Sequence, residues 1–325
     1  MCTAVTYQTK DHYFGRNLDY EFSYQERVTV TPRKFPFVFR YAETIPAHYA
    51  MLGMAYIQEG YPLYYDATNE MGLSIAGLNF PEHAVYHSIR EGSINLAPYE
   101  LIPRILGSCK TVGEAKALLA QINLVATPFS KELPLTPLHW LIADKNEAIT
   151  VEPMADGIRI YQNPVGILTN NPPFPLQMFA LNNFPYLSNQ EPDAAFCQRI
   201  PTERYSRGLG GLGLPGDLSS QSRFIRAAFC KLYSVSSPEE LSCVHQFFHI
   251  LGAVEQQRGC VCLGENVYEK TIYSSCCNTD RGIYYYTSYE NRRITAVDLH
   301  RENLNGDELV SYPVRYQGEI DLQNA

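Results

Sequence analysis

The hydrophobic pattern of the chain changes between two periods, one typical of strands and one typical of helices. Short runs that are apolar at every second residue, or apolar throughout, predict strands. The predicted strands cover 4–8, 12–14, 28–31, 35–40, 70–80, 138–143, 148–152, 157–161, 166–169, 271–275, 283–287 and 293–297. Helical spacing predicts helices at 98–106, 115–122, 221–233 and from 237 to about 251. Runs of strands separated by pairs of helices indicate a layered α+β domain.

Turn and capping residues support several of these boundaries. The polar stretch 144–147 separates two apolar runs, which is typical of a hairpin. Thr111 and Glu114 have the spacing of a capping box, and so do Ser237 and Glu240. Each pair therefore predicts the start of a helix.

One polar, loop-like stretch covers about 181–222. It contains Gly208-Leu209-Gly210-Gly211-Leu212-Gly213, which is formally a Gly-x-Gly-x-x-Gly motif. We reject a dinucleotide site, because no strand precedes the motif and Leu214-Pro215-Gly216 follows it in place of a helix. Neither a linker nor an internal repeat divides the chain, so we expect a single domain over 1–325.

Composition narrows the classes of protein and partner. The 325 residues are 45% hydrophobic and 18% charged, as in globular proteins, and the 24 tyrosines suit strands and amphipathic pockets. A formal net charge of −8 gives no electrostatic reason to expect binding to nucleic acid or to an anionic membrane. No run approaches the roughly 18 apolar residues of a transmembrane helix, and no signal peptide is visible. We therefore expect a cytoplasmic protein whose nine cysteines are free thiols.

Two patterns raise the possibility of a metal site. His83 and His87 have the i, i+4 spacing that suits a metal on a helix, but Gly and Pro flank the segment. Cys260-Val261-Cys262 and Cys276-Cys277 lack the Cys-x-x-Cys spacing of zinc sites. We expect neither a metal nor another cofactor.

Cys2 directly follows Met1. If Met1 is removed, one residue carries both a thiol and a free α-amine. An N-terminal amine can serve as the base that activates a nucleophile on the same residue. The amine has an ordinary pKa of about 7.7–8.0 and the thiol one of about 8.5, so a neutral amine can accept the thiol proton. The alternative is that a cysteine occurs at this position without a special role.

A predicted hairpin of 4–8 and 12–14 would bring Arg16 and Asp19 back beside Cys2. A carboxylate there could orient the α-amine, and a guanidinium could favour the thiolate. The alternative is an exposed ion pair, which contributes about 0–1 kcal/mol.

Three further polar residues lie at the ends of predicted elements. Asn79 ends a strand before Pro81, and Asn170 follows another strand; both could be turn residues. Arg223 lies in the first turn of a helix, where a cation is unfavourable to the helix dipole by roughly 0.3–1 kcal/mol. This position hints at a specific task for Arg223, although a solvated arginine would also fit.

The sequence Met1-Cys2-Thr3-Ala4, followed by Phe14-Gly15-Arg16-Asn17-Leu18-Asp19-Tyr20, resembles the choloylglycine hydrolase family. This family comprises bile salt hydrolases and penicillin V acylases, which are N-terminal-nucleophile amidases. The resemblance extends along nearly the whole chain. It implies a four-layer αββα sandwich of two stacked antiparallel sheets flanked by helices.

The resemblance also implies roles for single residues. The catalytic set would be Cys2, Arg16, Asp19, Asn79, Asn170 and Arg223, with Asn79 and Asn170 at the oxyanion. Loops at 18–24, 57–65 and 129–138 would form the acyl pocket. Its walls would include Leu18, Phe22, Ile57, Tyr65, Phe129 and Leu135. The excursion at 181–222 would help to assemble a homotetramer.

The reaction implied is cleavage of glycine- or taurine-conjugated bile salts through a Cys2 thioester. Asn79, where the acylases commonly carry Tyr, favours this branch over penicillin V acylase. The same thioester could instead pass its acyl group to another amine, and a binding module on an inactive scaffold would be a non-enzymatic role. The chain has no Gly-x-Ser-x-Gly motif, which argues against an α/β-hydrolase.

Overall fold

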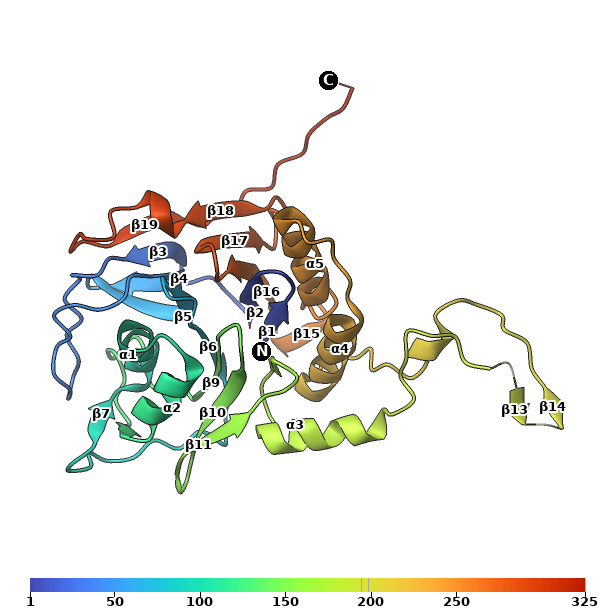
Figure 1. Cartoon of the computed structure of the whole chain (residues 1–325), viewed down its shortest axis with the longest axis horizontal. Helices are drawn as coiled ribbons and strands as arrows, with labels where there is room; N and C mark the ends of the chain where they lie inside the picture. The colour runs from blue at the N-terminus through green and yellow to red at the C-terminus, as the bar shows by residue number, and fades with distance from the viewer. Residues whose placement is uncertain (194, 198, 325) are drawn as a thin grey trace.

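Two antiparallel β-sheets, stacked face to face, form the centre of the computed structural model (Figure 1). The structure describes residues 1–193, 195–197 and 199–324. The first sheet has seven strands, with β15 paired to β16 beside the path β12-β1-β2-β16-β17-β18. Their bounds are β1 (Cys2–Gln8), β2 (His12–Tyr20), β12 (Ile167–Leu168), β15 (Val261–Gly264), β16 (Val267–Asn278), β17 (Ile283–Ser288) and β18 (Thr295–Asp298).

The second sheet has eight strands in the order β11-β10-β9-β6-β5-β4-β3-β19. Their bounds are β3 (Arg27–Thr31), β4 (Met51–Gln58), β5 (Tyr61–Asn69), β6 (Ser74–Asn79), β9 (Leu138–Ala143), β10 (Ala148–Met154), β11 (Gly157–Gln162) and β19 (Val310–Pro313). The two sheets meet where β1 and β2 pack on β6. Strand β1, which begins at Cys2, therefore lies in the middle of the molecule (Figure 1).

Two pairs of helices cover the outer faces of the sheets. Helices α1 (Leu101–Ser108) and α2 (Val112–Leu119) lie on the second sheet, and α4 (Ser220–Tyr233) and α5 (Glu240–Gly252) lie on the first (Figure 1). The short helix α3 (Phe174–Ala180) packs beside α4. This arrangement confirms the expected αββα sandwich. None of the helices in the described ranges has the length and apolarity needed to span a bilayer.

The remaining short elements lie outside the two large sheets. Strands β7 (Ile94–Leu96) and β8 (Ile122–Leu124) pair in parallel, and β13 (Ala195–Cys197) pairs with β14 (Ile200–Pro201). The short 3₁₀ helices are η1 (Pro98–Glu100), η2 (Leu181–Asn183), η3 (Leu209–Gly211) and η4 (Leu299–Arg301). The excursion at 181–222 extends away from the sandwich and carries β13 and β14 (Figure 1).

Several element predictions were confirmed, and others were wrong. The Thr111 hydroxyl accepts the Glu114 N–H at 3.2 Å and caps helix α2, but the Glu114 carboxylate accepts the N–H of Lys110 and not that of Thr111, so the capping box is only half formed. Helix α5, however, begins at Glu240 with Glu239 as its N-cap, and the segment from Ser237 is non-helical. The helix start predicted at Ser237 was therefore wrong. The predicted strand 35–40 is an irregular segment with one isolated bridge at Phe37. The predicted loop 57–65 is instead the turn and adjoining ends of the β4–β5 hairpin.

Gly15 allows strand β2 to approach strand β16 closely. A Cβ atom at Gly15 would lie 2.0 Å from the Ser275 carbonyl oxygen, which belongs to the backbone and cannot rotate away. We expect Gly15→Ala to lower the free energy of unfolding by about 3 kcal/mol, measured by urea denaturation. Gly113→Ala is the control, because the nearest atom to its Cβ is a side-chain oxygen 3.7 Å away and alanine favours helix α2. Equal stability of both variants would contradict this role of Gly15.

His12 makes the stability of the fold depend on pH. The His12 ring is buried against the Thr279 hydroxyl at 2.9 Å, and burial lowers its pKa from 6.5 to about 4 despite the nearby Asp280. The unfolded chain therefore gains a proton before the folded chain does. Stability is complete above pH 6.5 and falls as the pH drops toward 4, by roughly 3 kcal/mol in all.

We expect His12→Gln to remove this dependence. Between pH 7 and pH 5, the loss of unfolding free energy in the variant should be smaller than in wild type by about 2 kcal/mol. Denaturant titrations at the two pH values measure this difference. His300→Gln, at an exposed histidine, should behave as wild type. A wild-type pH dependence in His12→Gln would exclude His12 as its source.

Candidate active site

The register of β1 and β2 sets the two faces of the site. Cys2 pairs with Leu18, Thr3 with Asn17 and Ala4 with Arg16, which confirms the hairpin predicted from the sequence. Paired residues share a face of a sheet, and neighbours along a strand face opposite ways. Cys2, Leu18 and Arg16 therefore face the second sheet, while Thr3 and Asn17 face the helices α4 and α5.

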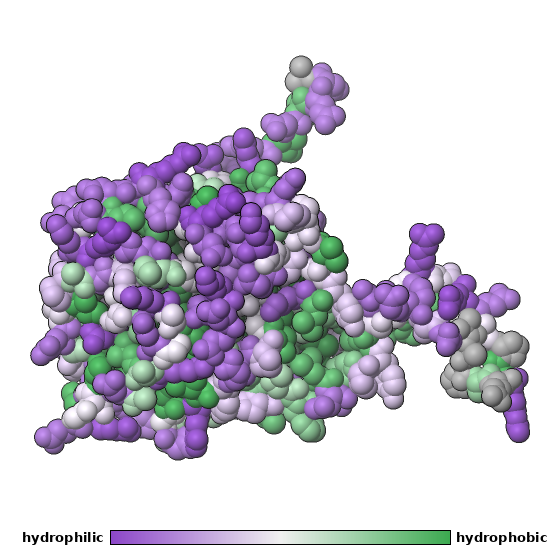
Figure 2. Space-filling view, in the orientation of Figure 1, coloured by the Kyte–Doolittle hydropathy of each residue, from purple (hydrophilic) through white to green (hydrophobic). Residues whose placement is uncertain are grey.

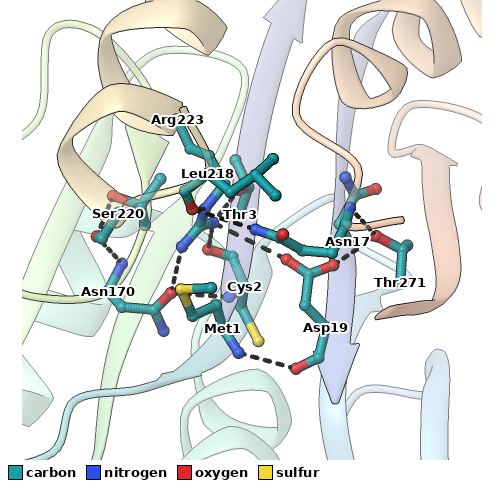
Figure 3. Close-up of polar contacts among 12 residues, drawn as sticks. Met1, Cys2, Thr3, Asn17, Asp19, Asn170, Leu218, Ser220, Arg223 and Thr271 are labelled. Atoms are coloured by element: carbon teal, nitrogen blue, oxygen red, sulfur yellow. Dashed lines mark hydrogen bonds and ion pairs between the residues drawn. The ribbon is translucent and has the colours of Figure 1, made fainter. Parts of the chain in front are cut away.

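Cys2 is only 4% exposed and lines a cavity between the layers. Its backbone N–H donates to Asn170 Oδ1 at 2.8 Å (Figure 3). The Met1 α-amine donates to the Asp19 carbonyl oxygen at 3.0 Å and forms an ion pair with Glu269. Burial lowers the pKa of this amine, although Cys2 and Asp19 counteract part of the shift. Burial at the chain start thus makes an amine there easier to deprotonate than a solvated one.

Arg223 reaches from α4 to the start of β1. It is fully buried, and its Nη1 donates to the Cys2 carbonyl oxygen at 2.5 Å and to the Thr3 hydroxyl at 2.6 Å (Figure 3). Its Nη2 donates to Asn170 Oδ1 at 2.8 Å, and its Nε donates to the Leu218 carbonyl oxygen at 3.1 Å. Arg223 therefore fixes both the nucleophile's backbone and the side chain of Asn170.

The contacts of Asn170 define which way its amide points. Arginine only donates hydrogen bonds, so the atom facing Arg223 must be the amide oxygen. The Asn170 Nδ2 group then faces strand β6 and donates to the Asn79 carbonyl oxygen at 2.7 Å. An amide nitrogen has two hydrogens, so one of them remains for another acceptor.

Asp19 is a buried carboxylate beside the nucleophile's strand. Its Oδ1 accepts the Thr271 hydroxyl at 2.6 Å, and its Oδ2 lies 3.9 Å from Arg223 (Figure 3). Oδ2 accepts no hydrogen bond from the described residues. Burial raises the pKa of Asp19, while the charges of Arg223 and the N-terminus act in the opposite direction. A nearby donor, such as an amine at the chain start, would satisfy Oδ2.

Arg16 crosses the space between the two sheets. Its Nη1 donates to the carbonyl oxygens of Tyr65 at 3.0 Å and Gly77 at 2.5 Å. Its Nη2 has no hydrogen-bond partner in the described part of the chain, and the residue lines the cavity with Cys2. Burial acts to lower the pKa of Arg16, but Cys2, Tyr273 and Asp66 raise it above its ordinary value. The guanidinium thus stays charged near the thiol.

A buried network that the sequence did not reveal supports the segment of Asn170. His139 Nε2 bonds to the Thr169 carbonyl oxygen at 2.8 Å, and its Nδ1 lies 3.3 Å from Glu152 Oε1. The His139 ring stacks on Phe80, with centroids 4.2 Å apart. The residue before Asn170 is therefore held by the second sheet. His139 and Glu152 lie in predicted strands and gave no other signal.

The cavity beside Cys2 has a volume of about 610 Å³. Four of the six predicted wall residues line it: Leu18, Tyr65, Phe129 and Leu135. Phe22 is absent from its lining because its ring packs on Tyr20 and Tyr24. Ile57 is also absent, because Tyr56 faces the cavity and the next residue along strand β4 points the other way.

The three predicted pocket segments, 18–24, 57–65 and 129–138, all contribute to the cavity walls, and other segments add to them. The further lining residues are Tyr20, Glu21, Tyr24, Tyr56, Leu63, Tyr64, Pro98, Tyr99, Thr127, Pro128, Leu133, Pro134, Thr136, Pro137, Leu138, Leu263 and Glu269, together with Met1, Cys2, Arg16, Asp19, Gly77 and Asn79. Six of the lining residues are tyrosines, which agrees with the expectation that the many tyrosines suit amphipathic pockets. The walls combine apolar surface with a few hydroxyl groups.

The histidines considered for a metal have other partners. His83 Nδ1 lies 2.7 Å from the Asn171 amide nitrogen, and His87 Nε2 lies 3.3 Å from the Met154 carbonyl oxygen. Among the described residues, no three His, Cys, Asp or Glu side chains are grouped to hold a metal ion. All nine cysteines are free thiols.

Comparisons with known proteins agree with this geometry. A family model described as linear amide C-N hydrolases, choloylglycine hydrolase family, matches residues 2–312. The chain is 54% identical over 324 residues to the bile salt hydrolase/transferase of Lactiplantibacillus plantarum, with 100% of each chain covered. A solved conjugated bile acid hydrolase of Clostridium perfringens superimposes with a TM-score of 0.92 at 34% identity, over 100% of both chains. Penicillin V acylase of Agrobacterium tumefaciens shares the fold, with a TM-score of 0.76 at 18% identity over 98% of this chain and 95% of that one.

The stacked sheets, with Cys2 opening a central strand, define an N-terminal-nucleophile hydrolase fold. The relatives narrow this class further. The chain belongs to the choloylglycine hydrolase family, whose members hydrolyse linear amide C–N bonds.

Proposed function

We propose that this enzyme hydrolyses the amide bond between a bile acid and glycine or taurine, through a thioester on Cys2 after Met1 is removed. The main support for this proposal is that Cys2 lies in a cavity of about 610 Å³, beside the buried network of Arg223, Asn170 and Asp19. The relatives named bile salt hydrolase and conjugated bile acid hydrolase support this choice of substrate. Ligand cavities commonly have volumes of about 300–1,000 Å³.

The first step activates the nucleophile. One hydrogen of the neutral Cys2 amine donates to Asn170 Oδ1, at the place where the Cys2 N–H does so now. The amine lone pair then accepts the thiol proton, and the Asp19 carboxylate stabilises the ammonium that forms. Arg16, charged and partly unpartnered, favours the thiolate by its proximity. Arg223 keeps the Cys2 carbonyl and Asn170 in place.

The second step forms and collapses the tetrahedral intermediate. The thiolate attacks the amide carbon, and the oxyanion lies near Asn79 and the remaining Asn170 Nδ2 hydrogen. The ammonium of Cys2 gives its proton to the departing glycine or taurine nitrogen. Water then attacks the thioester carbon, with the amine as base again, and releases the bile acid.

The cavity walls suit a steroid. Apolar residues from 129–138 and from strand β5 contribute hydrophobic surface, and the tyrosines add hydroxyl groups next to aromatic rings. A sterol body can pack against the hydrophobic surface, and its ring hydroxyls can form hydrogen bonds with the tyrosine hydroxyl groups.

The test compares substrates for the wild-type enzyme. Amine release from glycocholate and taurocholate is measured beside phenoxyacetate release from penicillin V. We expect cleavage of the bile salts to be preferred. A preference for penicillin V would move the enzyme to the acylase branch, and no cleavage by protein shown by mass spectrometry to lack Met1 would overturn the proposal.

We also propose that the single domain assembles into a homotetramer in the cytoplasm through its excursion at 181–222. Figure 2 shows apolar surface over α3 and α4, where the excursion leaves the sandwich. Exposed apolar side chains in this region and on the excursion include Leu176, Phe179, Tyr186, Tyr205 and Leu212. Light scattering after size exclusion should give four times the mass of the chain; a monomer would contradict this. The nine free thiols support a reducing compartment.

A further inference from the structure

The C-terminal segment contacts the loop that joins strands β2 and β3. This loop covers residues 21–26, and we call it the wall loop. After β19 the chain is held on the first sheet, where the Ser288 hydroxyl donates to the Arg315 carbonyl oxygen at 2.8 Å. The hydroxyl of the next residue, Tyr316, reaches the wall loop. Tyr316 thus connects the first sheet to a loop that is distant in sequence.

Glu26 is the centre of the hydrogen bonds in the wall loop. Its side chain is buried, its Oε2 accepts the hydroxyls of Ser23 and Tyr316, each at 2.5 Å, and its Oε1 accepts the Tyr24 N–H at 3.0 Å. Gln25 has a φ of 66°, which residues other than glycine rarely adopt, and its N–H donates to the Ser23 hydroxyl at 2.9 Å. The shape of the turn therefore depends on these hydrogen bonds.

Tyr316 differs from the other two donors to Glu26. Within the described part of the chain, it is the one donor to this carboxylate that comes from outside the wall loop. Burial and the charge of Glu26 raise the pKa of Tyr316, so the phenol keeps the proton that it donates. Hydrogen bonds to a charged acceptor are stronger than those between neutral groups. Loss of this one hydroxyl should therefore loosen the loop.

The wall loop supplies part of the cavity surface. Glu21 and Tyr24 both line the cavity. The Tyr24 ring packs against the rings of Tyr20 and Tyr56, with centroids 5.8 Å apart in each case, and both of these residues also line the cavity. Since Glu26 holds the backbone of Tyr24, it also sets the position of this aromatic wall.

We propose that Tyr316 is a positioning residue for substrate binding, because through Glu26 it fixes Tyr24 in the cavity wall. This role rests on the proposed function, since the acyl group must bind in this cavity. Tyr316 itself is absent from the cavity lining, so it acts on the wall and not on the reacting atoms. Its loss should weaken binding of the acyl group and spare the chemical step.

The first experiment follows the wall loop without a substrate. Hydrogen–deuterium exchange with mass spectrometry measures the peptide that covers 20–27 in Met1-free wild type, Tyr316→Phe and Tyr312→Phe. Because Glu26 accepts the Tyr24 N–H, exchange in this peptide should become about tenfold faster in Tyr316→Phe. An unchanged rate would overturn the proposal, whatever the substrate of the enzyme is.

Tyr312→Phe is the matched control. Tyr312 lies on the same C-terminal segment, and its hydroxyl donates to Glu302 Oε1 at 2.5 Å, outside the wall loop. The variant removes the same kind of bond and should exchange as wild type does. Equal acceleration in both variants would show a general loosening and would contradict a specific role for Tyr316.

The second experiment measures KM and kcat on the donor that the wild type cleaves, glycocholate or penicillin V. We expect Tyr316→Phe to raise KM by about fivefold and to keep kcat within about twofold, as for a loss of substrate binding alone. A fall in kcat with unchanged KM, or an equal rise of KM in Tyr312→Phe, would overturn the proposal. Which donor the wild type prefers reports on the proposed function alone.

Two truncations separate Tyr316 from the residues that follow it. A chain that ends at Gly318 keeps Tyr316, and a chain that ends at Val314 loses it. The first should have the wild-type KM and the second a KM at least about fivefold higher. A raised KM in the chain that ends at Gly318 would assign the effect to the last residues and contradict the role of Tyr316. If the shorter chain does not fold, Tyr316→Phe decides the question.

Discussion

Cys2→Ala should abolish amide hydrolysis, with a loss of about 10⁴-fold or more in kcat. The thiol is the one group in the cavity placed to form the thioester, and the α-amine that activates it belongs to the same residue. Alanine leaves the amine in place and fits the buried position, so the fold should persist. Glycine release from glycocholate gives the rate, and mass spectrometry confirms removal of Met1 in both proteins.

Cys2→Ser tests the contribution of the thiol while the α-amine is kept. Serine is close in size and keeps a hydroxyl, but a thiol is far easier to deprotonate with a base of this pKa. We expect weak residual activity for serine and none for alanine. Cleavage by Cys2→Ala at more than about a hundredth of the wild-type rate would exclude Cys2 as the nucleophile.

Arg223→Met should cost both activity and stability. It removes the donors to the Cys2 carbonyl, the Thr3 hydroxyl and the Asn170 side chain, and it leaves Asp19 buried without its cation. Loss of one partner of a buried pair typically costs about 3–5 kcal/mol. Since Asn170 also loses its fixed orientation at the oxyanion, we expect kcat to fall about 10²–10³-fold.

Arg226→Met is the matched control for this prediction. Arg226 lies one turn further on the same helix and is partly exposed, and within the described part of the chain its one hydrogen bond goes to the Pro215 carbonyl oxygen, at 3.2 Å. It should cost less than about 1 kcal/mol and leave kcat within about threefold of wild type. Adding Asp19→Asn to Arg223→Met should restore part of the stability and none of the activity. Equal losses for the two arginines would disprove a specific task for Arg223.

The local parts of the fold could be predicted from the sequence. The β1–β2 hairpin follows from its alternating pattern, and β16, β17 and β18 from three apolar runs with short turns. A strand that follows a change of sheet along the chain was harder to predict: β19 comes after β18 of the first sheet but pairs with β3 of the second, and its sequence has no strong pattern. The predicted strand 35–40 failed because its aromatic residues pack into the core without forming a ladder.

The same division holds for the site. Cys2, Arg16 and Asp19 are close in sequence, so a hairpin sufficed to bring them together. Asn170 and Arg223 meet Cys2 only through the sandwich, and the family resemblance was what singled them out. Register decides the cavity walls: Tyr56 faces inward and Ile57 does not, and no local signal distinguishes them.

The position of the chain start inside the sandwich has a practical consequence for anyone who builds a fusion of this enzyme. The N-terminus is enclosed between the sheets, whereas the C-terminal segment leads away from the sandwich (Figure 1). A purification tag or reporter attached before Cys2 would occupy the nucleophile's own amine as a peptide bond and block its use as a base. The same tag placed after the last residue would leave the catalytic machinery untouched, so the two ends of this protein are not interchangeable as attachment points.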